Sequence, residues 1–181
     1  MTTRSRATIE DLYRVPGKAE IVDGQLLVRE PTGGRPGYAA GEIFASLREH
    51  ARRTGQGRAV TDHNAFRVDL PNRESFSPDA AFYVGPDPGM RFYEGPPAFA
   101  VEVRSQGDYG PSAELAMAEK RRDYFAAGTL VVWDVDLLSE EVVRVYRASS
   151  PDVATVYRRG DTAEAEPAVP GWNMRVDDLF S

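Results

Sequence analysis

Two short apolar segments, each carrying one acidic residue, constrain this chain more than any other feature. Asp79 precedes the run Ala-Ala-Phe-Tyr-Val, and Glu102 lies inside the run Phe-Ala-Val-Glu-Val. Both segments are rich in β-branched or aromatic residues and are therefore predicted to be β-strands. Burying a carboxylate among apolar side chains is costly unless a cation or a hydrogen-bond donor compensates it. The alternative is that each acid faces solvent at the end of its strand.

If the two strands are neighbours, one divalent cation can compensate both acids. Hard cations such as Mg²⁺ are held by one or two carboxylates together with water and substrate phosphate oxygens. We therefore expect the side chains of Asp79 and Glu102 to lie on the same face of a sheet, close enough to share one ion. Without the ion, each carboxylate is expected to raise the pKa of the other.

A lysine in the following segment is the third candidate. Residues 111–127 are rich in helix-forming side chains, and Lys120 shares a helical face with Met117 and Tyr124. We expect this face to pack toward the sheet, where the long side chain of Lys120 can reach a charged pocket. The alternative is that Lys120 is a solvated member of the charged run 119–123.

These residues, in this order, resemble the Uma-type restriction endonuclease family of the PD-(D/E)XK nuclease superfamily. The resemblance rests on Pro78-Asp79, on Val101-Glu102-Val103 followed by Ser105, on Lys120 with Tyr124, and on Val131-Val132-Trp133-Asp134. It covers most of the chain, since segments 20–24, 142–146, 170–172 and 179–180 also agree with the family pattern.

The resemblance implies a restriction-endonuclease-like α/β fold, in which a mixed β-sheet is flanked by helices and preceded by an N-terminal hairpin. It also implies that Mg²⁺ or Mn²⁺ is held by Asp79 and Glu102, with the backbone carbonyl of Val103 as a further ligand. Nucleases of this superfamily often place an extra acid from an N-terminal element near the metal, which makes Glu20 a candidate ligand. The alternative for Glu20 is a cross-strand contact within the hairpin.

The catalytic cation is where this chain departs from the superfamily pattern. The pattern has Lys two residues after the Glu, and this chain has Arg104 there. In the Uma-type branch the lysine lies on the next helix, so the resemblance predicts that Lys120 is catalytic. Strand alternation places Arg104 on the face of Glu102, where it can form a salt bridge with Glu102 or contact substrate phosphate. Many relatives also carry His before the first long helix, where this chain has Pro36, so no role is assigned to that position.

Length and composition agree with one nuclease-like domain spanning residues 1–181. A chain of 181 residues can bury one substantial core. No apolar stretch approaches the ~20 residues of a membrane-spanning helix, and no signal peptide is recognisable, so a cytoplasmic location is the default expectation. The chain contains no Cys, which excludes disulfides and thiolate metal ligands.

The net charge of −6 weakens long-range attraction to nucleic acid. Arginines nevertheless cluster near the end of the first long helix, and Arg52 and Arg53 in this cluster are candidates for contacting substrate. A solvated helix face explains the cluster equally well.

The remaining elements follow from periodicity and turn signals. Helices are predicted at 8–13 and 38–53, a hairpin over Asp23-Gly24, and strands at 58–61, 65–70, 129–134, 142–146 and 155–158. Gly and Pro predict loops at 31–37, 85–97 and 163–170. Pro71-Asn72 is expected to lead directly into the Asp79 strand.

Two functions from different classes follow from these observations. The first is a metal-dependent DNA endonuclease that hydrolyses phosphodiester bonds, with a homodimer implied by the superfamily habit of cutting two strands. The second is a catalytically inactive nuclease-like scaffold that binds nucleic acid or a protein partner. The presence of both acids and of Lys120 favours the endonuclease.

Overall fold

A six-stranded mixed sheet forms the centre of the computed structural model, which describes residues 6–180. Its strands, in spatial order, are β11 (Ser150–Tyr157), β10 (Val143–Arg147), β9 (Val131–Val135), β8 (Phe99–Val103), β6 (Ala80–Tyr83) and β3 (Arg58–Thr61). Only β8 and β9 run parallel to each other; the other neighbours are antiparallel. The predicted mixed sheet is therefore confirmed, and so is the adjacency of the two acid-bearing segments.

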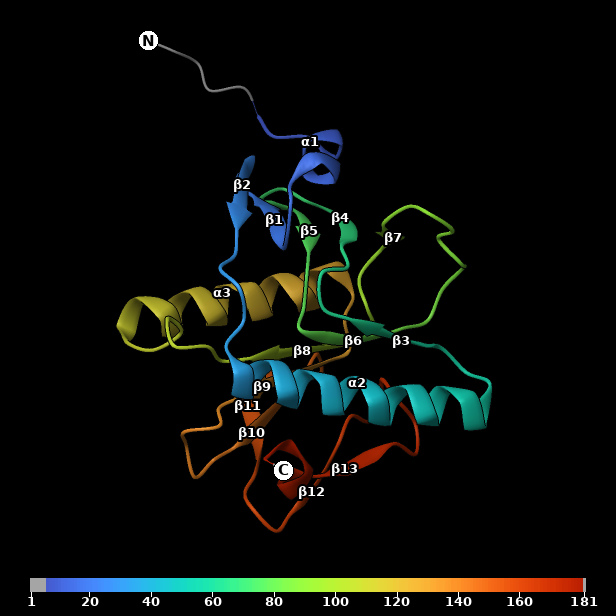
Figure 1. The fold of residues 1–181 in the computed structure, drawn as a ribbon, viewed down its shortest axis with the longest axis vertical. Helices are drawn as coiled ribbons and strands as arrows, with labels where there is room; N and C mark the ends of the chain where they lie inside the picture. Colours follow the sequence, from blue (N-terminus) through green and yellow to red (C-terminus); the bar gives the residue numbers. More distant parts are fainter. Residues whose placement is uncertain (1–5, 181) are drawn as a thin grey trace.

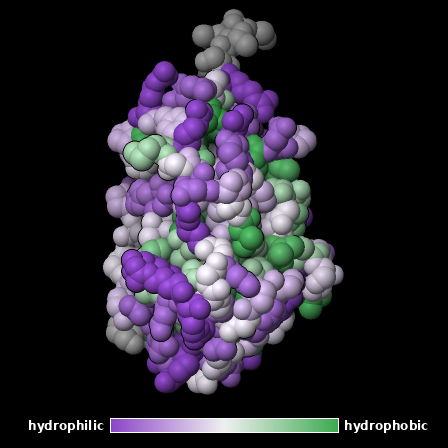
Figure 2. All heavy atoms as spheres, turned by 90° about the vertical axis from the view of Figure 1, so that its right-hand side faces the viewer, coloured by the Kyte–Doolittle hydropathy of each residue, from purple (hydrophilic) through white to green (hydrophobic). Residues whose placement is uncertain are grey.

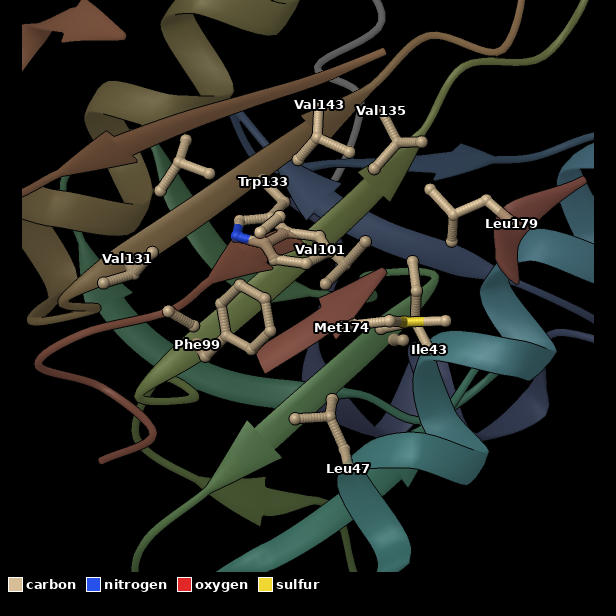
Figure 3. Close-up of a cluster of buried hydrophobic side chains, with 14 of the residues drawn as sticks. Ile43, Leu47, Phe99, Val101, Val131, Trp133, Val135, Val143, Met174 and Leu179 are labelled. Carbon is tan, nitrogen blue, oxygen red and sulfur yellow. The ribbon is translucent and has the colours of Figure 1, made fainter. Parts of the chain in front are cut away.

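Helices cover both faces of this sheet, α2 (Gly34–Thr54) on one and α3 (Pro111–Ala127) on the other (Figure 1). Alternation along each strand divides the side chains between the two faces. On β8, Phe99 and Val101 belong to the core beneath α2, whereas Ala100 belongs to the core beneath α3. The face beneath α2 is filled by large apolar side chains, among them the labelled residues of Figure 3. Glu102 has the parity of Ala100 and therefore faces α3.

A second, five-stranded sheet lies on the α3 side of the molecule (Figure 1). Its order is β2 (Gln25–Val28), β1 (Ala19–Val22), β5 (Arg73–Phe76), β4 (Phe66–Leu70) and β7 (Tyr93–Glu94). The predicted hairpin forms its edge. Asp23 and Gly24 have φ values of 50° and 71°, which is the conformation that a two-residue hairpin turn requires.

The two ends of the described chain pack in different places, the N-terminal helix against β1 and the C-terminal segment on the α2 side of the central sheet. Helix α1 (Ile9–Arg14) is capped by Thr8, whose side chain forms the expected cap together with Asp11. The C-terminal strands β12 (Thr162–Glu164) and β13 (Asn173–Arg175) and the 3₁₀ helix η1 (Val176–Leu179) lie on the α2 side. The Trp172 indole N–H donates a 3.0 Å hydrogen bond to Ser46 of α2.

The structure corrects several of the predicted boundaries, and β11 begins at Ser150, well before the predicted strand 155–158. Helix α2 begins inside the predicted loop 31–37, since Pro36 falls in its first turn, where a missing N–H costs no helical hydrogen bond. Pro71-Asn72 does not lead directly into the Asp79 strand; it is the turn into β5, which sequence analysis missed. The predicted loop 85–97 contains the two-residue strand β7, and the predicted loop 163–170 overlaps β12.

The face of the molecule that carries the β7 region shows a mixed surface (Figure 2). Hydrophilic residues dominate the top and the lower left of this view, and hydrophobic residues form smaller groups on its right side. Among residues 6–180, no helix is long and apolar enough to cross a membrane.

The glycine just before β3 provides a test of how Phe82 packs against the backbone in the core beneath α2. Gly57 has a φ of 66°, and a Cβ atom there would lie 2.2 Å from the ring of Phe82. Gly57→Ala should therefore lower the free energy of unfolding by at least ~2 kcal/mol, from backbone strain and core displacement together. Urea denaturation measures this change.

The control is Gly41→Ala in α2, where a Cβ meets no atom within 4 Å. This variant should be more stable than wild type by ~0.5–1 kcal/mol, because alanine favours a helix interior. Equal stability of the two variants would contradict the packing of Phe82 against the Gly57 backbone.

Candidate active site

A cleft of ≈ 790 Å³ lies between the β1–β2 hairpin and helix α3. Its floor is formed by the ends of the acid-bearing segments and contains Asp79 and Glu102. The walls are formed by the hairpin and the loop after it, including Leu27, Val28, Arg29, Pro31 and Thr32, and by the α3 residues Ala113, Ala116, Met117, Lys120 and Arg121.

Strand register places the two acids side by side. Ala80 of β6 pairs with Val101 of β8 in an antiparallel ladder, so the residue before Ala80 lies beside the residue after Val101. Those residues are Asp79 and Glu102. Asp79 also has the parity of Ala81, which packs in the core beneath α3. The two side chains therefore share one face of the sheet, as predicted.

Asp79 is held by one lysine and one backbone amide. The Nζ of Lys18 lies 2.5 Å from Asp79 Oδ1, and the Val103 N–H donates a 2.6 Å hydrogen bond to Asp79 Oδ2. The same Lys18 ammonium lies 2.8 Å from Oδ1 of Asp62, in the turn after β3. Burial alone would lower the pKa of Lys18, but Asp79 and Glu102 raise it above its ordinary value. Lys18 is therefore a buried, charged ammonium between two acids.

Glu102 is held by the helix above it. Its Oε1 lies 2.7 Å from Lys120 Nζ and accepts a 2.6 Å hydrogen bond from the Tyr124 hydroxyl. Burial raises the pKa of Glu102, opposed by Lys120 and reinforced by the nearby charge of Asp79. Burial, together with the charge of Glu102, also raises the pKa of Tyr124 well above its ordinary value, so this hydroxyl stays a donor. The expected orientation of Lys120 toward the sheet is confirmed.

Glu20 is fully buried and belongs to the same network. Its Oε1 lies 2.9 Å from Lys120 Nζ and accepts a 2.8 Å hydrogen bond from the Ser77 N–H, and its Oε2 accepts a 3.0 Å bond from Arg73. Burial would raise the pKa of Glu20, but Lys120 and Arg73 lower it to about 2. Its cross-strand neighbour on the hairpin is Leu27, so Glu20 forms no polar pair there. The main contact of Glu20 is with the lysine that also holds Glu102.

The polar centre of the cleft thus consists of two acid–lysine–acid chains, Asp62–Lys18–Asp79 and Glu20–Lys120–Glu102. Arg73 adds a third cation to this network through its contact with Glu20. Among residues 6–180, no group of three or more acidic, His or Cys side chains is arranged to hold a metal ion. Asp79 and Glu102 are two neighbouring carboxylates, and one or two carboxylates completed by water and phosphate oxygens are enough to hold Mg²⁺.

Arg104 does not contact Glu102 in this structure. Its guanidinium forms a two-point pair with Asp134, with nitrogen–oxygen distances of 2.8 and 2.7 Å, and a further pair with Glu114 in the first turns of α3. The N–H groups of the Arg104 guanidinium are thus engaged by Asp134 and Glu114. Asp134 lies directly beside Glu102 in the β8–β9 register, so an arginine that pairs with Asp134 is on the face of Glu102. The predicted face of Arg104 is therefore right, but its two partners were not predicted.

The arginines near the end of α2 lie apart from the cleft. Arg52 and Arg53 are exposed, do not line it, and belong to the helix on the opposite face of the central sheet. Two exposed cleft residues, Arg29 and Arg122, make no ion pair with any described residue. These two arginines are better placed than Arg52 and Arg53 to contact a substrate that enters the cleft.

Sequence analysis missed Lys18, although the composition contains a signal for it. Of the 22 basic residues only two are lysines, Lys18 and Lys120, and all others are arginines. Both lysines are in the polar centre, with side chains 10% and 11% exposed. Lys18 also has the strand parity of Glu20, which the sequence shows directly.

Comparison with solved structures shows which fold this chain adopts. A crystal structure described as a putative nuclease belonging to DUF820, from Anabaena variabilis ATCC 29413, is similar with a TM-score of 0.73 and 16% sequence identity. The similarity covers 96% of this chain and 97% of that one, and it shows a restriction-endonuclease-like fold. No match was found among curated proteins.

The family is shown by sequence. Residues 9–177 match the model of the Uma2 family, described as "Putative restriction endonuclease". The chain belongs to the Uma2 family, and its family and fold together indicate a nuclease.

The pKa of Glu20 predicts a specific acid sensitivity. A carboxyl whose pKa is lower in the folded than in the unfolded state stabilises the fold above its unfolded pKa, and this stabilisation is lost as pH falls toward the folded value. Because the folded value is about 2, wild type should lose about 2 kcal/mol of unfolding free energy from this group between about pH 5 and pH 3.

Glu20→Gln should lack this component, so its unfolding free energy should fall less steeply over the same interval in urea titrations. Glu140→Gln, which removes an exposed carboxylate, is the control and should follow the wild-type curve. Parallel curves for wild type and Glu20→Gln would show that Glu20 is not paired as described.

Proposed function

We propose that this protein is a metal-dependent endonuclease that hydrolyses phosphodiester bonds in DNA. The observation that carries the proposal is the convergence of Asp79 and Glu102 on one cleft, with Lys120 2.7 Å from Glu102. The residues were expected from their separate strand and helix patterns, and the site brings all three together. Membership of the Uma2 family supports the same reaction class.

In this proposal Asp79, Glu102 and the Val103 carbonyl hold Mg²⁺ or Mn²⁺. When bound, the ion supplies Lewis-acid activation of a water molecule and neutralises charge on the phosphate. The protein contributes the fixed placement of the two carboxylates. The Val103 N–H orients Asp79, and the Tyr124 hydroxyl and Lys120 orient Glu102 through the same oxygen, Oε1. The described residues make no hydrogen bond to Glu102 Oε2, which leaves it free to bind the cation.

Lys120 is the proposed catalytic cation. Its ammonium contacts Glu20 on one side and Glu102 on the other. These two contacts fix its position in the cleft. An ammonium there can hold the attacking water or stabilise charge that develops on the phosphate. Arg104 is a positioning residue in this account, because Asp134 and Glu114 take up its donors. Glu20 is assigned to holding Lys120 rather than to binding metal.

The substrate side of the proposal rests on the cleft walls. Exposed Arg29 and Arg122 offer unpaired positive charge to a phosphate backbone, whereas Arg52 and Arg53 cannot reach the same phosphate from the opposite face of the sheet. Cutting both strands of a duplex calls for two active sites, so the homodimer stays a prediction that light scattering can check.

Purified protein should cleave plasmid DNA only when Mg²⁺ or Mn²⁺ is present. Asp79→Asn and Glu102→Gln should each abolish cleavage, and each should abolish Mn²⁺ binding in isothermal titration calorimetry, because each removes a proposed ligand. Agarose-gel assays of supercoiled plasmid measure cleavage.

Glu140→Gln is the matched control, since it makes the same chemical change on the exposed surface, and it should cleave at the wild-type rate. Metal-independent cleavage, or unchanged metal binding in both ligand variants, would remove the metal site from the proposal. DNA binding without cleavage by folded wild type would instead support an inactive scaffold.

Lys120→Ala should reduce the metal-dependent cleavage rate by at least ~10²-fold, because a positioned acid–base or charge-stabilising group contributes about that much. Its Mn²⁺ affinity should not fall, because the variant keeps both proposed ligands and removes a positive charge 2.7 Å from Glu102. Single-turnover kinetics with saturating metal separate the two effects.

Arg104→Ala is the comparison, and it should lower the unfolding free energy while leaving the single-turnover rate of the folded fraction within ~10-fold of wild type. The opposite result, a wild-type rate for Lys120→Ala and a large loss for Arg104→Ala, would transfer the catalytic role to Arg104.

A further inference from the structure

We propose that Lys18 is a built-in counter-cation of the metal site, which occupies Asp79 in the metal-free protein and moves onto Asp62 when the divalent cation binds. Lys18 thereby sets the metal affinity of the site. This inference rests on the proposed function, because it takes Asp79 to be a metal ligand. Lys18 acts through Asp79 and is therefore a positioning residue.

The distances describe an ammonium shared between two acids. Lys18 Nζ lies 2.5 Å from Asp79 Oδ1 and 2.8 Å from Asp62 Oδ1. An ammonium has three donors, so it can bond both carboxylates at once or keep one bond while the other is lost. A divalent cation on Asp79 would repel this ammonium at close range. Lys18 can leave Asp79 without losing its remaining partner.

Asp62 is suited to receive the ammonium. It lies in the turn between β3 and β4 and its side chain is 24% exposed, compared with 12% for Asp79. Its other ionic neighbour is His63, 3.5 Å away and 61% exposed. Its Oδ1 also accepts a 2.8 Å hydrogen bond from the His63 N–H, so this acid stays in place to receive the ammonium. The pair Lys18–Asp62 can therefore persist beside a filled metal site.

The second lysine is built differently. Lys120 is shared between Glu102 and Glu20, but Glu20 is fully buried and is also fixed by Arg73 and by the Ser77 N–H. Lys120 therefore keeps its position whether or not a cation binds Glu102. Lys18 combines a short contact to a proposed ligand with a partly exposed alternative acid, whereas the alternative acid of Lys120 is fully buried. This difference assigns the counter-cation role to Lys18 rather than Lys120.

Double-mutant calorimetry with Mn²⁺ tests the proposal directly. Lys18→Met should raise Mn²⁺ affinity by at least ~10-fold, since close charge pairs usually couple by that much or more. Lys18→Arg keeps the charge and should bind near the wild-type affinity. Asp62→Asn should lower affinity several-fold, because it leaves Lys18 with Asp79 as its only partner.

The decisive comparison is Asp62→Asn in the Lys18→Met background. The proposal expects no effect there, because no ammonium remains to be received. A purely through-space effect of the Asp62 charge would lower affinity equally in both backgrounds, and that result would overturn the proposal.

The lysine composition allows a second measurement on the unaltered protein. With only two lysines in the chain, ¹⁵N-lysine labelling yields two side-chain ammonium signals, assigned with Lys18→Arg. On titration with Mg²⁺ the Lys18 signal should shift strongly, and the Lys120 signal should shift much less. An unshifted Lys18 signal at saturating Mg²⁺ would overturn the proposal even if Lys18→Met failed to fold.

The outcomes separate this inference from the proposed function. Equal Mn²⁺ affinity of wild type and Lys18→Met, with binding still abolished by Asp79→Asn, overturns the counter-cation role and leaves the metal-dependent nuclease standing. No Mn²⁺ binding by folded wild type or by folded Lys18→Met overturns both.

Discussion

The charge balance of four clustered carboxylates is the constraint on which the site depends. Each of two lysines bridges a proposed metal ligand to a second acid, so neither ligand is left uncompensated in the low-dielectric floor of the cleft. The residues of the polar centre come from separate elements. Glu20 belongs to β1, Glu102 to β8 and Lys120 to α3, while Lys18 and Asp79 are the residues just before β1 and β6. The centre therefore forms only when both sheets and α3 have assembled.

Helix α3 is held over this centre by ion pairs near both of its ends. Toward its start Glu114 is tied to β8 and β9 through Arg104, and toward its end Asp123 is tied to β5 through Arg73. Lys120 lies between these two anchors. Arginine occupies both anchors, where its planar fork offers several donors to two acids, and lysine occupies the two positions that contact the proposed metal ligands. The choice between the two basic residues thus follows the geometry of each position.

Much of the candidate site could be predicted from local patterns. Alternation along the two acid-bearing strands and the helical spacing of Met117, Lys120 and Tyr124 are properties of the backbone period, so Asp79, Glu102 and Lys120 were found before any tertiary information. The exact limits of α3 and its Gly128 stop were predictable for the same reason. Strand β5 was missed because Arg, Glu and Ser at 73–75 do not form a hydrophobic strand pattern. Arg73 contacts Glu20 and Asp123, and Ser75 contacts the β1 backbone.

The sequence by itself determined which residues share a strand face or a helix face, because those relations extend over a few residues and depend only on backbone geometry. It also contained the family relationship. The tertiary structure decided which charges meet: Lys18 with Asp79 across 61 positions, Arg73 with Glu20 across 53, and Arg104 with Asp134 rather than Glu102. These pairings depend on how two sheets and a helix close around one cleft. No periodicity encodes them, because electrostatic partners are selected by distance in space and by burial, not by spacing along the chain.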